Sequence, residues 1–265
     1  MGLLKLAFTR VPKDHDLLSP RRSSRKAALA FVHIPKTAGT WFAHFLRQHF
    51  TAAEIATPLY DVPETTDFSD PAKRFFTGHF RTLAINAKRP MRLVTFLRDP
   101  FQRTASHYRS WRFNEISREA VNDETAKAMD WVQQASYEDF VFSKNPTIEG
   151  SIRNIQTAYL SSFPNHNHPD FLKSAIGNLE DKFFFIGLQE FTRESLQLFK
   201  YQTGSTTEPE FSTLNVSERY DVTLSEAGRQ RLQELLHNDI LVYQAAQRLF
   251  ERRQAAMSGW FRKVA

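Results

Sequence analysis

A short loop sequence decides the fold of this 265-residue chain: His33-Ile34-Pro35-Lys36-Thr37-Ala38-Gly39-Thr40. The apolar run 28–32 before it is typical of a buried strand, and apolar residues recur at helical spacing over 41–50 after it. A strand therefore enters a loop that carries Lys, Gly and Thr, and the loop opens a helix. Backbone N–H groups at a helix start, the helix dipole and a lysine all favour a bound anion, so the stretch predicts an anion site.

The loop is not a Walker loop, in which Lys directly follows the last Gly of Gly-x-x-x-x-Gly-Lys-Ser/Thr. Here Lys36 comes before Gly39. An ordinary strand–turn–helix corner with a surface lysine has the same pattern, so the loop alone leaves both interpretations open.

A second strand–helix unit follows. The apolar and β-branched run 91–97 predicts a strand, and Asp99 and Pro100 suit the N-cap and the first position of a helix over 100–112. Gln102 falls at the third helical position, where its side chain can complete a capping box.

This unit carries a second candidate for anion binding. Arg98 lies at the carboxyl end of the predicted strand, where ligands bind in open α/β sheets, and Ser106 lies in the helix that follows. A guanidinium and a hydroxyl together suit a phosphate group. The alternative is a buried structural pair of Arg98 and Asp99.

Together, segments 33–40 and 97–108 resemble the sulfotransferases that use 3′-phosphoadenosine 5′-phosphosulfate (PAPS). They are most similar to the branch that contains the heparan sulfate 2-O-sulfotransferases and related carbohydrate sulfotransferases. The resemblance implies an α/β fold with a P-loop-like central parallel sheet flanked by helices. It also implies that the first loop binds the 5′-phosphosulfate and that the Arg and Ser of the second unit bind the 3′-phosphate. The first role falls on Lys36, Thr37, Ala38, Gly39, Thr40 and Trp41, and the second on Arg98 and Ser106.

Other segments resemble the same family in the same order. Residues 76–80 are similar to its Gly-His element, which implies that His79 is the catalytic base. Residues 153–160, 185–191 and 215–217 are similar to three further elements, so the resemblance spans about 28–250. The family often carries Gly at the position of Ala38. We expect alanine there to have little effect on binding if its φ is negative.

Composition fits one α/β domain over residues 27–265, preceded by a basic extension over 1–26. The extension contains the run Arg21-Arg22-Ser23-Ser24-Arg25-Lys26, which suits a solvated tail or a polyanion-binding segment. The expected parallel strands are 28–34, 74–78, 91–97 and 182–187. Helices are expected over 130–142, 151–161 and 192–201, with a long amphipathic helix from about 223, and loops over 57–71, 114–128 and 163–170. We expect 114–128 to be a mobile loop beside the acceptor site.

The chain has no cysteine and no run of eighteen apolar residues, so we expect no disulfide, no thiolate metal site and no membrane span. The family's Golgi members carry an N-terminal anchor and usually cysteines. Because we expect neither feature in this chain, we expect a cytoplasmic, bacterial enzyme. The net charge of +6 suits a polyanionic donor and an acidic glycan, and no nucleic acid is expected as a partner. The sequence predicts no oligomeric state.

Sulfuryl transfer requires three tasks: deprotonating the acceptor, stabilising the leaving group, and holding both reactants in line. His79 suits the first task because an imidazole titrates near neutrality, although a carboxylate base remains open. Lys36 suits the second, and Arg98 and Ser106 suit the third by anchoring the nucleotide. No metal is required, and the acceptor is expected to be a glycan or a small hydroxylated molecule. The alternatives are a nucleotide kinase or NTPase of related fold and a non-catalytic polyanion-binding protein.

Overall fold

The computed structural model describes residues 11–15, 17–18, 27–58, 68–85, 87–208 and 222–264, the last six of these by their backbone alone. The described residues contain one parallel sheet in the order β2-β1-β3-β4. Its strands are β1 (Ala28–Val32), β2 (Phe75–Gly78), β3 (Met91–Leu97) and β4 (Phe183–Leu188). The predicted α/β fold with a central parallel sheet is confirmed, and all four strands begin within one residue of the predicted positions.

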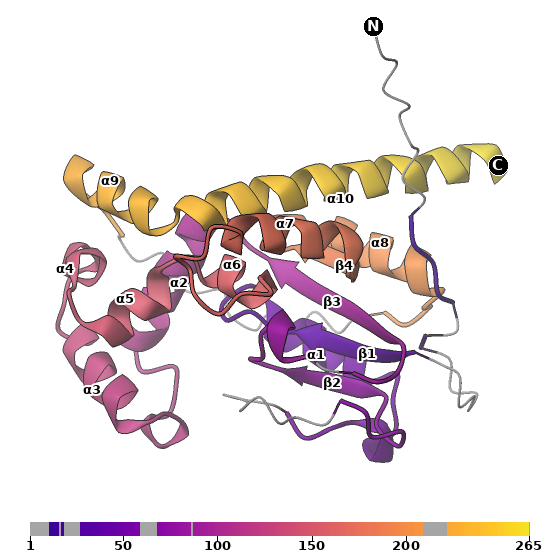
Figure 1. Ribbon diagram of the computed structural model, residues 1–265, viewed down its shortest axis with the longest axis horizontal. Coiled ribbons are helices and arrows are strands. Elements are labelled where there is room, and N and C mark those ends of the chain that lie inside the picture. The colour runs from indigo at the N-terminus through magenta and orange to yellow at the C-terminus, as the bar shows by residue number, and fades with distance from the viewer. Residues whose placement is uncertain are drawn as a thin grey trace, which may run out of the picture.

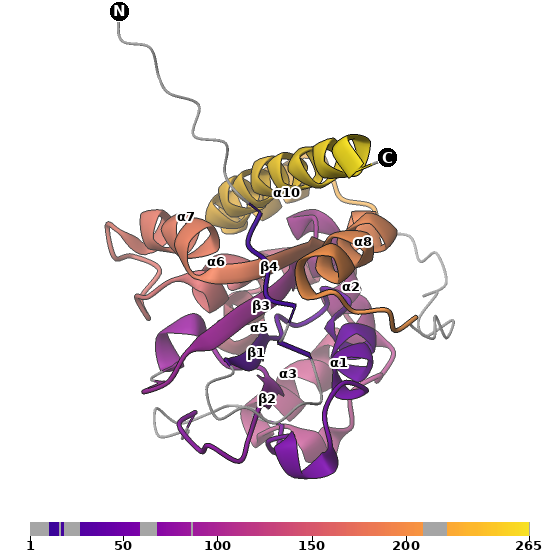
Figure 2. The ribbon, with the colours of Figure 1, turned by 90° about the vertical axis from the view of Figure 1, so that its right-hand side faces the viewer.

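Helices cover both faces of the sheet, as the unbroken apolar runs of β1 and β4 require. Figure 2 shows α1 (Gly39–Arg47) and α8 (Thr192–Thr203) on one face, and α6 (Ile155–Leu160) and α7 (Phe171–Asp181) on the other. The long helix α10 (His237–Val264) crosses the edge formed by β4. α8 ends where predicted, because Gly204 takes the left-handed conformation at its C-terminus.

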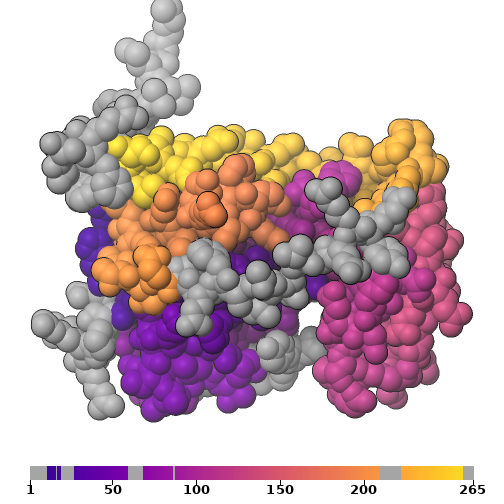
Figure 3. All heavy atoms as spheres, turned by 180° about the vertical axis from the view of Figure 1, so that it is seen from behind, coloured from indigo at the N-terminus to yellow at the C-terminus, as the bar shows by residue number. Residues whose placement is uncertain are grey.

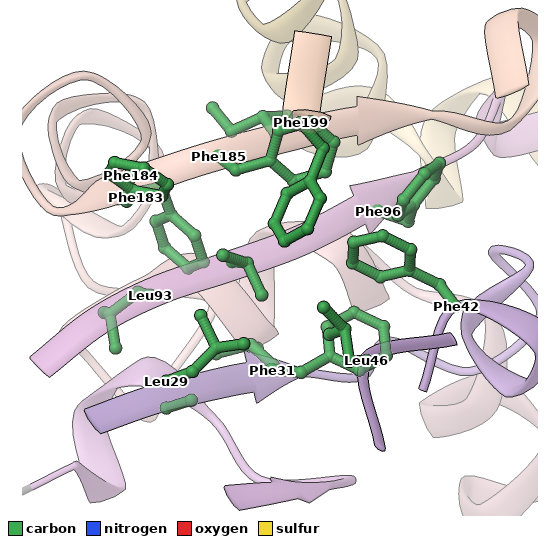
Figure 4. Close-up of a cluster of buried hydrophobic side chains, with 14 of the residues drawn as sticks. Leu29, Phe31, Phe42, Leu46, Leu93, Phe96, Phe183, Phe184, Phe185 and Phe199 are labelled. Carbon is green, nitrogen blue, oxygen red and sulfur yellow. The ribbon is translucent and has the colours of Figure 1, made fainter. Parts of the chain in front are cut away.

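The main core is rich in phenylalanine, and Figure 4 shows Phe42 of α1 beside Phe96, near the carboxyl end of β3. The Phe42 ring is 4.7 Å from that of Phe96 on β3 and 5.3 Å from that of Phe199 on α8. It also contacts Phe31 of β1 and Phe185 of β4. One side chain therefore joins three strands to two helices, directly below the loop that precedes α1.

A second hydrophobic cluster lies beyond the sheet. It is built by α2 (Pro100–Arg112), α3 (Asp123–Val132), α4 (Tyr137–Phe142), α5 (Pro146–Ile152) and α9 (Glu226–Leu235). Figure 1 shows α3, α4 and α5 gathered at one end of the molecule, and α2 leads to them from the end of β3. We call α3, α4 and α5 the helical lobe. Short 3-10 helices cover Ala52–Glu54, Thr82–Ala84, Arg118–Ala120 and Gln189–Phe191.

Two expectations about the helical lobe are wrong. The predicted loop 114–128 is helical from Asp123, because the Asn122 side chain accepts a hydrogen bond from the Thr125 N–H at 2.9 Å and caps α3. The single helix predicted over 130–142 is two helices. Ser136 and Asp139 form a capping box that starts α4 after a turn.

Two longer helices are divided in the same way. The helix predicted over 151–161 is interrupted at Asn154, whose φ of 48° lies in the left-handed region. The long helix predicted from about 223 begins at Glu226, with Ser225 as its N-cap. It ends at Leu235, and α10 begins at His237.

The described part of the N-terminal segment packs against the domain. Val11, Leu17 and Leu18 are buried in the main core, and the Asp14 N–H donates to the Gln202 carbonyl at 2.8 Å. The domain boundary at residue 26 stays a prediction. The segment 215–217 and most of the loop 57–71 lie outside the described residues. Among the helices that the structure describes, none combines the length and apolarity that a membrane span needs.

We predict that Phe42→Ala lowers the free energy of unfolding by about 3–5 kcal/mol, because it leaves a cavity among rings from three strands. The control is Phe142→Ala on α4, where the side chain is 43% exposed and the expected change is within about 0.5 kcal/mol. Chemical denaturation of both variants measures the difference. Equal losses would show that Phe42 does not join the layers of the core.

Candidate active site

The parallel sheet places three predicted site segments at one edge. Val32 pairs with Gly78 on β2 and with Thr95 on β3, so these three strands end side by side. The loop with Lys36 follows β1, His79 follows β2, and Arg98 follows β3. The Arg98 guanidinium donates to the Lys36 carbonyl at 3.3 Å, so these two segments touch.

The loop after β1 has an unusual backbone. Lys36 and Ala38 have φ values of 67° and 68°, in the left-handed region. Between them, the Thr37 side chain is fully buried, and its hydroxyl donates to the Ile34 carbonyl at 2.9 Å. Thr37 therefore offers a ligand its backbone rather than its hydroxyl. Left-handed residues alternating in a loop turn backbone N–H groups toward a common point, which is the geometry of an anion nest.

We expect alanine at position 38 to have little effect on binding if its φ is negative. Its φ is positive, so that condition is not met. Alanine pays a steric cost in the left-handed region that glycine does not pay. Gly39 is needed for a different reason. A Cβ atom on Gly39 would lie 2.0 Å from Cδ2 of His33, so only glycine lets α1 begin against that ring.

His33 and His79 form a pair of imidazoles in contact at the start of the loop, with their ring planes tilted by 30°. Their ring centroids are 4.6 Å apart, and the other side of His33 stacks on Phe31. Burial, and then the nearby charge of His79, lower the pKa of His33 to about 3. His33 is therefore neutral near pH 7 and supports the loop as a packing residue.

The backbone fixes the tautomer of His79. Its Nδ1 lies 3.0 Å from the His33 carbonyl oxygen. Because a carbonyl only accepts, Nδ1 carries the proton and the neutral ring has its lone pair on Nε2. A neutral imidazole held in this way can accept a proton at Nε2.

Lys36 has an acidic partner that the sequence did not identify. Its Nζ lies 3.2 Å from Oε2 of Glu115, in the segment between α2 and α3. The Glu115 N–H donates to the Ser110 carbonyl at 2.9 Å after the left-handed residue Asn114, so the end of α2 turns back toward the loop. The position of Glu115 in a segment expected beside the acceptor site was the available signal.

Arg98 is partly buried at the end of β3. Burial lowers its pKa, and the Glu190 carboxylate opposes this effect; an arginine side chain nevertheless remains charged in a protein. Ser106 is buried two turns into α2. Asp99 caps α2 as predicted, since its carboxylate accepts from the Gln102 N–H at 2.9 Å. The N–H of Asp99 itself donates to Glu190, so no capping box with Gln102 is needed there.

The remaining predicted loop residues lie on the first turn of α1. Thr40 is exposed, and Trp41 is half-buried with its ring 5.7 Å from that of Phe96. From the sequence, His107 is expected to be a structural or surface residue. In the structure it is buried on α2 beside Trp111. Burial lowers its pKa well below the usual range, and neither ring nitrogen has a hydrogen-bond partner in the described part of the chain. Within the described residues, no three His, Cys, Asp or Glu side chains are grouped to hold a metal ion.

Comparison with known proteins agrees with this arrangement. A sequence model of the sulfotransferase family matches residues 22–244. The chain belongs to the sulfotransferase family. It is also similar to heparan-sulfate 6-O-sulfotransferase 3 from Homo sapiens, with 34% identity over 82 residues. That region is 31% of this chain and only 17% of the human protein. The human protein is named for 6-O sulfation, whereas the sequence resemblance was to the 2-O branch, so the position of sulfation is not carried over.

We predict that Ala38→Gly stabilises this sulfotransferase-family chain. Removing the strain of a left-handed alanine raises the free energy of unfolding by about 1–2 kcal/mol. Glycine also makes the unfolded chain more flexible, which lowers the free energy of unfolding by about 0.4–1 kcal/mol. The control is Ala43→Gly in the interior of α1, where glycine should cost about 1 kcal/mol. Chemical denaturation should therefore give changes of opposite sign. A loss at both positions would contradict the strained conformation of Ala38.

Proposed function

We propose that this chain transfers a sulfuryl group from PAPS to an acceptor hydroxyl on a carbohydrate, by in-line displacement. The observation that carries the proposal is the meeting of Lys36, His79 and Arg98 at the carboxyl edge of one parallel sheet. Two cations and a candidate base, from three separate strand ends, are what this reaction needs.

The residues at this edge fit the nucleotide. PAPS, when bound, supplies an activated sulfuryl group on a phosphate leaving group, and its two phosphate-bearing ends need two cationic positions. Lys36 and the backbone of Thr37, Ala38, Gly39, Thr40 and Trp41 would hold the 5′ end. Arg98 and Ser106 would hold the 3′-phosphate. The left-handed residues of the loop and the buried position of Arg98 support this assignment, because both favour a fixed anion over bulk water.

Lys36 stabilises negative charge as it develops on the leaving group. Its side chain is 25% exposed, and its Nζ is paired with Glu115, so the position of its charge is restrained. A positively charged group fixed where charge develops lowers the barrier without reorganisation.

His79 accepts the proton of the acceptor hydroxyl at Nε2. The His33 carbonyl holds the proton on Nδ1, so the ring is oriented before the acceptor binds. His33 stays neutral beside it and adds no competing charge. Glu115 is the carboxylate alternative for the base, because its Oε2 lies 3.2 Å from Nζ of Lys36.

The acceptor approaches between the loop and the helical lobe. Seen from behind in Figure 3, the surface is hollowed between the purple atoms near residues 50–85 and the magenta atoms of α2 and the lobe. A carbohydrate acceptor is supported by the similarity to an enzyme named for heparan sulfate and by the chain's net charge of +6.

A binding experiment tests this function. Adenosine 3′,5′-bisphosphate without magnesium should raise the melting temperature more than ATP does, because Arg98 needs a 3′-phosphate. Arg98→Ala should weaken binding of the bisphosphate by about 1.5–3 kcal/mol and hardly affect adenosine 5′-phosphate. A larger shift with ATP and magnesium would favour a kinase or NTPase. Shifts with heparin alone would favour a polyanion-binding protein.

We predict that Lys36→Ala lowers sulfuryl transfer by about 10²–10³, the usual effect of removing one electrostatic donor from a reacting centre. The fold should remain intact, because Lys36 is partly exposed and Glu115, with which it forms an ion pair, is a surface residue. Transfer from labelled PAPS and the melting temperature are measured on the same sample. Turnover within about tenfold of the parent would remove Lys36 from the reaction.

We predict that His79→Ala lowers turnover by about 10²–10⁴ with little change in the affinity for adenosine 3′,5′-bisphosphate. Activity of the parent should rise with pH as the base loses its proton. Glu115→Gln is the matched comparison, because it removes the nearby carboxylate charge and keeps the shape. If Glu115→Gln loses activity while well-folded His79→Ala keeps it, the base is the carboxylate.

A further inference from the structure

We propose that Gln156 is a positioning residue for Arg98, and that Asp239 holds Gln156 in place. The inference rests on the proposed function, because it concerns how Arg98 is aimed at the 3′-phosphate. Gln156 lies on α6, across the sheet edge from the loop, and its side chain is fully buried.

The Gln156 amide occupies both backbone polar groups of Arg98. The Arg98 N–H donates to Oε1 of Gln156 at 3.0 Å, and Nε2 of Gln156 donates to the Arg98 carbonyl at 2.8 Å. A planar amide that binds both groups of one residue fixes the point from which that side chain leaves the backbone. The guanidinium is then the only polar part of Arg98 available to a ligand.

Gln156 is fixed in turn by a fully buried carboxylate. Asp239, in the first turn of α10, accepts from the Gln156 N–H at 3.1 Å. Its other oxygen accepts from the N–H and the hydroxyl of Thr157, both at 2.7 Å. Asn154 belongs to the same hydrogen-bond network, since its side chain accepts from the N–H of Asp239 at 3.3 Å. The starts of α6 and α10 are thereby locked together behind Arg98.

The charges around Asp239 fit a structural anchor. Burial raises its pKa, and the Thr157 N–H and the charge of fully buried Arg103 oppose that rise. Arg103 also donates to the Ser151 carbonyl at 3.0 Å, at the end of α5. A buried network whose members are bonded on several sides has one arrangement, so it can set a position precisely.

A separate pair of contacts holds the residue after Arg98. The Asp99 N–H donates to one oxygen of Glu190 at 2.9 Å, and the Tyr243 hydroxyl donates to the other at 2.6 Å. The β3–α2 turn is therefore bonded to α6 on one side and, on the other, to Glu190 in the 3-10 helix after β4, which Tyr243 of α10 also contacts. Because the Arg98 guanidinium also contacts the Lys36 carbonyl, Gln156 sets the spacing between the two ends of the nucleotide site.

The experiment compares Gln156→Leu with Gln202→Leu. Gln202 is an equally buried glutamine, and its Nε2 donates to the Phe184 carbonyl on β4 at 2.8 Å, away from the site edge. Calorimetry measures the dissociation constants for adenosine 3′,5′-bisphosphate and adenosine 5′-phosphate. The dissociation constant of the 5′-phosphate divided by that of the bisphosphate gives a ratio that reports the contribution of the 3′-phosphate and does not depend on the stability of the fold.

We expect Gln156→Leu to lower this ratio by about tenfold, because a misplaced Arg98 loses part of a charge-assisted contact. Gln202→Leu should change the ratio by less than about twofold, although both variants lose stability. In the background of Arg98→Ala, Gln156→Leu should have no further effect on the ratio. If Gln156→Leu fails to fold, Asp239→Asn keeps the shape of the anchor and should lower the ratio in the same direction.

An unchanged ratio in the folded variant, with a normal preference in the parent, would overturn the positioning role and leave the proposed function standing. An equal fall in Gln202→Leu would also overturn it. A parent chain that binds both nucleotides equally would overturn the proposed function, and this inference with it.

Discussion

β1 pairs in parallel with β2 on one side and with β3 on the other, and the site depends on this pairing. Parallel strands end at the same edge, so one register brings together residues that are more than sixty positions apart in the sequence. The Thr95 hydroxyl reinforces the pairing by donating to the Val32 carbonyl at 2.9 Å, in the last pair before the loop. A change of register would move His79 and Arg98 away from the loop at once.

The edge of the sheet contains strained and buried polar groups that the core must support. Two left-handed residues in the loop each cost about 1–2 kcal/mol, and the buried group of Asp239, Gln156 and Arg103 gains stability only because its members are bonded. The phenylalanine cluster beneath the loop supplies rigidity where it is needed. Phe42 is three residues after Gly39, so the residue that packs the core also fixes the start of the helix at the proposed anion site.

The sequence predicted the strands and the residues at their ends well, because a buried parallel strand is a continuous apolar run with a definite end. It predicted the breaks in the helices poorly. Ser136 and Asn154 each precede a new helix, and α10 begins anew at His237, yet each break lies in a stretch whose composition also suits an uninterrupted helix. The conformation of Ala38 could not be predicted either, since alanine rarely takes a positive φ and no local pattern indicates one.

The missed residues Glu115 and Gln156 share one property. Their partners are 79 and 58 positions away, and only the tertiary fold brings them into contact. Gln156 lies in the segment 153–160 that resembles the family, and Glu115 lies in the segment expected beside the acceptor site, but neither local pattern indicates the contact with a predicted site residue. Gln156 acts from the sheet side and Glu115 from the side of the helical lobe.

This difference separates the two halves of the candidate site. The donor half is anchored to the main core, through β1, β3, α6 and α10, and its geometry is fixed by buried hydrogen bonds. The acceptor half faces the helical lobe, which packs in a second hydrophobic cluster and meets the loop through the partly exposed pair of Lys36 and Glu115. An exposed ion pair is weak, whereas a buried amide that bonds both backbone groups is not easily replaced. In the proposed function, the surface that faces the acceptor can therefore vary while the contacts that hold the donor stay constant.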